Sequence, residues 1–217
     1  MMVLGVLLSP GLVNAQSRFF AGGVGGVATL SADAQTSITS ASASVSTYRP
    51  FNGPALNIFA GTHVNDYLSL QVNYIWNSND LAVTSTLAST SSLIGYEEKR
   101  ASSQHSGIFD VLIYFRNRNS GVRPYLSGGS GVVRFKSSRQ ELVNMQGSPA
   151  LFPVEFTSSE LALRAAVGID FAVGRQFAIR YSFSETIRRN PVSSRLSPPG
   201  ERNLANFQNL VGIVKYF

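Results

Sequence analysis

The chain has 217 residues, of which 44% are hydrophobic and only 14% charged, and it contains no cysteine. Soluble domains usually carry about 25% charged residues, so this composition is poor in charge for a soluble protein. The absence of cysteine excludes disulfide frameworks, zinc ribbons and thiol catalysis. The formal charge of +6 comes from basic residues that are scattered singly, apart from the pairs Lys99–Arg100 and Arg188–Arg189, and this argues against nucleic acid as a partner.

Residues 1–15 have the pattern of a secretory signal peptide. A short apolar run is broken at Pro10–Gly11, and Val13-Asn14-Ala15 forms a small-residue cleavage pattern. The basic residues that usually open such a signal are missing, so we expect a signal peptide over residues 1–15 with a truncated n-region, followed by one domain over residues 16–217. No stretch of roughly 18 apolar residues predicts a membrane-spanning helix.

The domain consists of eight stretches in which apolar and polar residues alternate, a pattern typical of β-strands with one apolar face. In chain order they span residues 18–31, 54–64, 68–77, 106–116, 123–136, 159–173, 176–187 and 204–217. Most reach the length that a tilted strand needs to cross a bilayer, about 9–11 residues. The sequence therefore predicts eight strands of membrane-spanning length.

The connections between these stretches alternate between long and short. Long polar segments are expected near residues 32–53, 78–105, 137–158 and 188–203, and short turns near residues 65–66, 117–121 and 174–175. A soluble sandwich has no reason to keep long loops at one end and tight turns at the other. An outer-membrane barrel does, because one end faces the periplasm and the other faces the outside.

The two faces of the predicted strands differ in side-chain size and polarity. The apolar faces carry large side chains, among them the face of the first strand that holds Phe20, Val24, Ala28 and Leu30. The opposite faces carry polar and charged residues among small ones: Gln71, Asn73, Asp110, Arg164, Asp170 and Arg180. The interior of an eight-stranded barrel is too narrow for two rows of large side chains, so we expect the apolar faces to contact lipid. Because a sheet in lipid must leave no open edge, the predicted fold is all-β, a closed eight-stranded antiparallel up-and-down transmembrane β-barrel.

Three segments make the chain resemble the outer-membrane β-barrel domain family, in the eight-stranded form similar to the transmembrane domain of outer-membrane protein A. They are Arg123–Gly129 (RPYLSGG), similar to the fifth strand of the family, Ala166–Phe171 (AVGIDF) in the sixth, and the terminal Phe217. The resemblance implies this fold and a location in the outer membrane of a Gram-negative-type bacterium. The family includes structural, adhesive and defensive proteins and a few enzymes, so the fold alone does not choose the function.

The last strand also resembles the C-terminal signal that the barrel-assembly machinery reads. Val211, Ile213 and Phe217 lie on one face of an alternating stretch that closes on an aromatic residue. Lys215 falls on the same face, where the signal usually has an apolar residue, but a lysine at the interface can extend its ammonium into the headgroups. The resemblance therefore implies the assembly machinery and outer-membrane lipids as partners.

Four ionisable residues are expected at membrane depth on the interior face. Asp170 and Arg180 flank a turn centred near residue 175, which places them opposite each other on adjacent strands, and Arg164 extends the row toward Asp110. These residues form either a gate in a permeation path or a structural ion-pair network. We favour the structural network, because side chains about fill the interior of an eight-stranded barrel.

The sequence contains no recognisable catalytic, cofactor or metal site. His63 and His105 are expected at opposite ends of the barrel, and no activated nucleophile is paired with a base and an orienting acid. We therefore expect no enzyme and no cofactor, and a structural or surface-interaction role in which four long outward loops contact an extracellular ligand or surface. The alternatives are a narrow diffusion pore, a lipid-modifying enzyme and a soluble lipocalin-like barrel, which would place Leu70, Val72 and Phe177 inside.

Overall fold

The computed structural model describes residues 18–30, 34–89, 92–147, 153–192 and 203–217, so the expected signal peptide over residues 1–15 lies outside the described residues. The described residues form ten β-strands: β1 (Phe19–Leu30), β2 (Ala34–Ile38), β3 (Ser42–Pro50), β4 (Gly53–His63), β5 (Leu68–Ser89), β6 (Leu93–Tyr114), β7 (Val122–Gln146), β8 (Glu155–Ala172), β9 (Phe177–Arg189) and β10 (Asn203–Tyr216). Within these ranges, no helix has the length and apolar character needed to cross a membrane.

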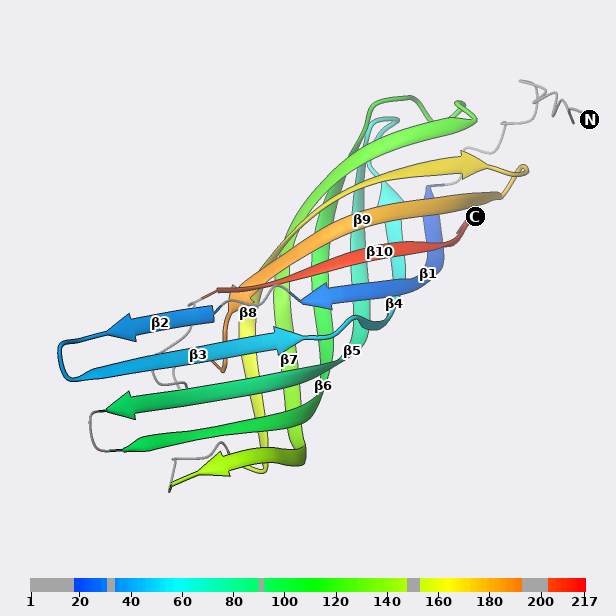
Figure 1. The fold of residues 1–217 in the computed structure, drawn as a ribbon. Coiled ribbons are helices and arrows are strands. Elements are labelled where there is room, and N and C mark those ends of the chain that lie inside the picture. The colour runs from blue at the N-terminus through cyan, green and yellow to red at the C-terminus, as the bar shows by residue number, and fades with distance from the viewer. Residues whose placement is uncertain (1–17, 31–33, 90–91, 148–152, 193–202) are drawn as a thin grey trace, which may run out of the picture.

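Eight of these strands close into a ring (Figure 1). Following the pairings, the ring runs β1, β10, β9, β8, β7, β6, β5, β4 and back to β1, and every pair is antiparallel. Closure gives each strand two hydrogen-bonded neighbours, so the ring leaves no open edge to lipid. The predicted eight-stranded antiparallel barrel is confirmed.

Short turns connect the strands at one end of the barrel, as predicted. Val64 N donates to Leu68 O, Phe115 N donates to Pro124 O, and Val173 N donates to Phe177 O, and these bonds tie β4 to β5, β6 to β7 and β8 to β9. We call this the short-turn end.

The opposite end differs from the prediction, because residues expected in long loops are in strands. β5 and β6 have 22 residues each and β7 has 25, whereas a bilayer needs only about 9–11. The predicted loop over residues 78–105 is mostly the far half of the β5–β6 hairpin.

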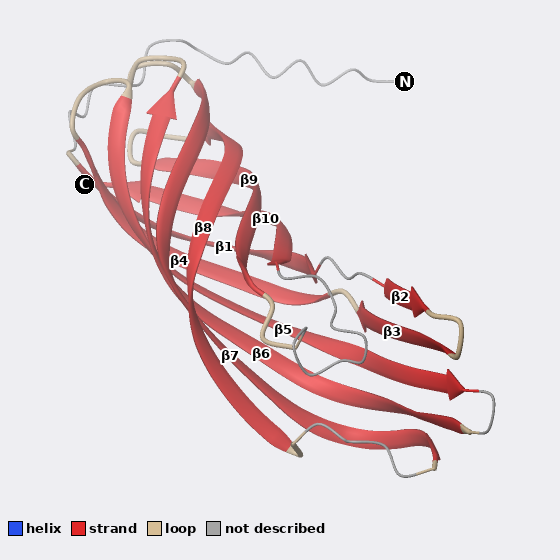
Figure 2. Cartoon of the chain, turned by 90° about the vertical axis from the view of Figure 1, so that its left-hand side faces the viewer, coloured by secondary structure: helices blue, strands red, loops and turns tan. Residues whose placement is uncertain are grey.

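β2 and β3 form a second hairpin, and β3 pairs with β5 from Ser42↔Ser89 to Pro50↔Leu81. The outer parts of these strands form a flared extension (Figures 1 and 2). We call it the outer sheet, and it comprises residues 34–38, 42–50, 81–89, 93–101 and 137–146.

The lipid-facing assignment holds for most strands. Val72, Leu163 and Phe177 are exposed on the outside of the ring by 57%, 67% and 45% of their surface. Polar residues of the same strands, including Asn73 and Arg164, are buried inside. This arrangement is the reverse of a lipocalin-like barrel and is the one expected for a barrel in lipid.

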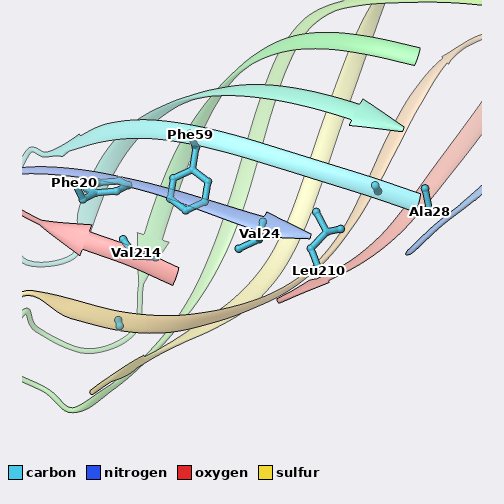
Figure 3. Close-up of a cluster of buried hydrophobic side chains, with 8 residues drawn as sticks. Phe20, Val24, Ala28, Phe59, Leu210 and Val214 are labelled. Atoms are coloured by element: carbon cyan, nitrogen blue, oxygen red, sulfur yellow. The ribbon is translucent and has the colours of Figure 1, made fainter. Parts of the chain in front are cut away.

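The assignment is wrong for β1, whose apolar face points into the barrel. Phe20, Val24, Ala28 and Leu30 are buried, and the first three pack with Phe59 and with residues of β9 and β10 (Figure 3). Alternation shows that a strand has two different faces but not which one is inside. In β1 the outward positions are held largely by small residues, so the larger side chains are free to fill the lumen on this side.

Candidate functional site

The interior beside the short-turn end is organised around one carboxylate. Asp170 on β8 lies opposite Arg180 on β9 in the sheet register. Arg180 donates from Nε to Asp170 Oδ1 at 2.7 Å and from Nη2 to Oδ2 at 2.8 Å. Both side chains are buried, and the paired geometry is the planar two-point contact that a guanidinium and a carboxylate prefer.

Further polar groups complete the surroundings of this ion pair. The hydroxyls of Tyr114 and Tyr216 both donate to Asp170 Oδ2 at 3.1 Å. Arg180 donates from Nη1 to Gln71 Oε1 at 2.8 Å. Both hydroxyls point into the lumen, so these two tyrosines are not part of an aromatic girdle at the membrane interface. The Arg180 guanidinium also lies 4.7 Å from the centre of the Phe59 ring, a distance at which a cation is attracted to the ring face.

A second ion pair fills the interior further from the short-turn end. Arg164 on β8 donates from Nη1 to Asp110 Oδ2 on β6, and Asn73 donates to the same oxygen at 3.1 Å. The two charged residues are not on adjacent strands, because Gly129 of β7 lies between them in register. A Cβ at Gly129 would collide with Asp110 Oδ1 and with the carbonyl oxygen of Phe109. The glycine therefore leaves the space that the Arg164–Asp110 contact uses.

Amide side chains occupy the next level of the lumen. Asn57 donates to Asn73 Oδ1 at 3.1 Å, Asn206 donates to Asn77 Oδ1 at 3.1 Å, and Asn77 donates to Asn79 Oδ1 at 2.7 Å. These residues come from β4, β5 and β10 and are all buried. Polar side chains in a lumen must find partners of this kind, since burying an unpaired amide costs about 1–3 kcal/mol.

A third charged cluster lies on the buried face of the outer sheet, and the sequence analysis missed it. Glu98 and Arg100 on β6 are fully buried, and Arg100 Nη1 donates to Glu98 Oε1 at 2.6 Å. Arg139 of β7 donates to the other oxygen of Glu98 at 2.6 Å. Burial, followed by the nearby Glu98 carboxylate, raises the pKa of the neighbouring Tyr96 phenol to about 12. Because residues 78–105 were expected to form a loop, nothing in the pattern indicated an interior face there.

Two histidines lie far apart, as predicted. His63 is buried near the short-turn end, where its Nδ1 lies 2.6 Å from Ser69 Oγ. His105 lies on the outer face of β6, with its Nδ1 2.7 Å from the hydroxyl of Tyr74. Ser69 is fully buried, which leaves its hydroxyl without access for a substrate. Among the described residues, no three His, Cys, Asp or Glu side chains are grouped so as to hold a metal ion.

The residues predicted to form an assembly signal lie on the lipid face of β10 and beside it. Val211, Ile213 and Phe217 are exposed on the outside by 56%, 57% and 60%. Lys215 shares this face, and its ammonium lies 4.8 Å from the centre of the Phe217 ring. Recognition of these residues by the assembly machinery remains a prediction.

A closed ring of antiparallel strands with an apolar outer face and a lumen of paired charges defines a transmembrane β-barrel of the outer-membrane type. Residues 3–212 match the outer membrane protein beta-barrel domain family, and the chain belongs to it. The protein is therefore an outer-membrane protein in contact with the lipids of that membrane. No curated protein is significantly similar to it in sequence.

Solved structures share the fold at low sequence identity. Neisserial surface protein A, from Neisseria, is 16% identical with a TM-score of 0.54, and the similarity covers 92% of this chain and 97% of that one. Ail, the attachment invasion locus protein of Yersinia pestis, solved with the heparin analogue sucrose octasulfate, is 13% identical with a TM-score of 0.50, and the similarity covers 93% of this chain and 100% of that one.

Proposed function

We propose that this protein is a closed barrel that anchors the outer sheet at the cell surface, where that sheet contacts an extracellular ligand or surface. The observation that carries the proposal is the outer sheet itself. Its strands continue from β5, β6 and β7. The β5–β6 pairing extends to Ala88↔Leu93, and the β6–β7 pairing extends to Gly95↔Gln146 with two register shifts between Glu97 and Arg100. A paired sheet holds side chains in fixed positions, as a contact surface requires, whereas a flexible loop would lose entropy on binding.

The side chains at the tip of the outer sheet fit this role. Ile38, Leu93 and Met145 are exposed by 77%, 44% and 53%. They lie beyond the length of strand that a bilayer needs, so lipid does not account for their exposure. Apolar side chains exposed outside the membrane are typical of protein contact sites. Ail is an attachment protein of Yersinia pestis, and the shared fold supports a surface contact here as well.

The interior supports an anchor rather than a pore or an enzyme. Ion pairs and amide contacts occupy successive levels of the lumen, with Arg180, Arg164 and Arg100 each held by a carboxylate. A continuous water path would have to break several of these buried contacts. The proposal includes no catalytic step, since His63 and His105 are not assembled with an accessible nucleophile.

The function is tested by adhesion of intact cells. Cells of a non-adherent Gram-negative host that express the protein are expected to bind immobilised matrix proteins or cultured cells more strongly than cells with an empty vector. A variant with Ile38→Ser, Leu93→Ser and Met145→Ser is expected to lose this binding. Val173→Ser is the matched control, because Val173 is 60% exposed at the short-turn end.

A second measurement separates the anchor from a pore. The purified protein in planar bilayers is expected to give no discrete current steps. Wild-type adhesion no greater than that of the empty vector, together with reproducible current steps, would replace the proposed function with a diffusion pore.

A further inference from the structure

A small cavity of about 40 Å³ opens at the short-turn end of the barrel. It lies between the turn that joins β6 to β7 and the turn that joins β8 to β9. Its polar lining consists mainly of His63, Arg118, Arg123, Asp170, Arg175 and Tyr216. One water needs about 10–15 Å³ measured in this way, so the cavity has room for a group of several atoms. In outer-membrane barrels this end faces the periplasm.

Arg123 brings a buried positive charge to this cavity. The residue is 5% exposed, and no carboxylate of the described residues lies within ion-pair distance of its guanidinium. Its Nη2 donates to the carbonyl oxygen of Asp66 at 3.2 Å, and its guanidinium carbon lies 3.8 Å from the centre of the Tyr114 ring. Its Nε is buried and has no hydrogen-bond partner in the described part of the protein.

Arg118 supplies a second buried donor without a partner. Its Nε donates to Asp66 Oδ1 at 2.8 Å, but its Nη1 is buried and makes no hydrogen bond within the described ranges. Two arginines that line the same cavity thus each keep one N–H group unpaired. An unpaired buried donor is costly, more so when the group is charged.

The carboxylates near the cavity are already engaged. Asp66 is paired with Arg118, and Asp170 is paired with Arg180 and accepts from two tyrosine hydroxyls. Arg123 and Arg175 are therefore left with no carboxylate partner among the described residues. The cavity has an excess of positive charge even though Asp170 is part of its wall. Water could pair with the free N–H groups, but it would not balance this charge.

We propose that this cavity binds a small oxyanion, either inorganic phosphate or a carboxylate group, that enters from the periplasmic side. Guanidinium groups hold carboxylate and phosphate oxygens through charge-assisted hydrogen bonds. Arg123 Nε and Arg118 Nη1 supply the buried donors, and the exposed Arg175 on the turn adds charge at the entrance. The cavity is at the end of the barrel opposite the outer sheet. Anion binding at this cavity is therefore independent of the proposed function of the outer sheet.

The test is equilibrium dialysis of the full chain, refolded in maltoside micelles that carry no phosphate, against radiolabelled phosphate at constant ionic strength. Saturable binding is expected, with competition by acetate if the site takes carboxylates as well. Arg123→Gln is expected to weaken binding about tenfold or more, the range for loss of a hydrogen bond to a charged group. Arg134→Gln, which removes an exposed charge on the outer face of β7, should leave binding unchanged.

A second variant tests the site if Arg123→Gln does not fold. Arg175 is exposed on a turn, so Arg175→Gln is expected to fold, as checked by heat-dependent gel mobility, and to weaken binding several-fold. Absence of saturable binding of both phosphate and acetate to the folded wild-type protein would overturn the proposal. Binding that is unchanged in both variants would overturn it as well, because the anion would then lie elsewhere.

Discussion

Asp170 and Arg180 face each other across the β8–β9 pairing and are joined by two hydrogen bonds of 2.7 and 2.8 Å. Both side chains are buried in the lumen. The pair is also the point where Tyr114 and Tyr216, from β6 and β10, reach across the barrel to the same carboxylate. Arg180 also donates to Gln71 of β5, so the hydrogen bonds of this ion pair connect five of the eight strands of the ring.

Asp170→Ala is expected to destabilise the barrel by about 3–5 kcal/mol, because it leaves Arg180 as an uncompensated buried charge. The double variant Asp170→Ala with Arg180→Ala should recover part of this loss, since the unpaired charge is then gone. Denaturant unfolding in lipid vesicles measures both free energies. Glu155→Ala, at an exposed position of β8, is the control and should change little. Additive effects of the two single substitutions would show that the pair is not energetically coupled.

Gly129→Ala is expected to destabilise the protein by about 1–3 kcal/mol, the range for overpacking a filled interior. The added methyl group would collide with Asp110 Oδ1 and with the carbonyl oxygen of Phe109. Gly128→Ala is the matched control on the adjacent residue, because a Cβ there meets nothing within 4 Å on the lipid face. Its free energy of unfolding should stay within about 0.5 kcal/mol of wild type. Equal losses for the two variants would contradict the assignment of Gly129 to the lumen.

Val167→Arg is expected to cost about 2–4 kcal/mol if the residue lies near the bilayer midplane, because it places a charge on the lipid face. Val167 is 48% exposed on the outside of β8. Ser89→Arg, at the tip of β5 in the outer sheet, should be nearly neutral since the side chain is in water. Refolding into vesicles followed by denaturant titration compares the two. If Ser89→Arg lowers the free energy of unfolding as much as Val167→Arg does, the membrane-spanning part of the barrel has been assigned to the wrong residues.

The parts of the fold that follow from period-two alternation were predictable from the sequence. The eight ring strands, the short turns and the inward direction of Asp110, Arg164 and Asp170 all follow from which side chains share a face. The opposition of Asp170 and Arg180 needed one more step, since a tight turn centred near residue 175 fixes the register of the strands beside it. For two strands joined by a tight turn, these local rules set which residues face each other.

The parts that were missed depend on contacts between distant strands. Phe20 and Val24 were assigned to lipid because alternation does not say which face is inside, and only packing against Phe59 and Leu210 settles it. The buried Glu98–Arg100 pair was missed because the segment around it is rich in small polar residues and was predicted to be a loop. Such residues form strands here because β5, β6 and β7 pair with one another along nearly their whole length.

Labelling of single cysteines in intact cells tests the central claim most directly, that the long strands carry a folded sheet outside the membrane while the short turns face the periplasm. The chain has no cysteine, so each variant carries one thiol. Ser89→Cys at the tip of the β5–β6 hairpin should react with a membrane-impermeant maleimide on intact cells. Asn119→Cys in the β6–β7 turn should react only after the outer membrane is permeabilised. Labelling of Asn119→Cys but not Ser89→Cys on intact cells would contradict the account.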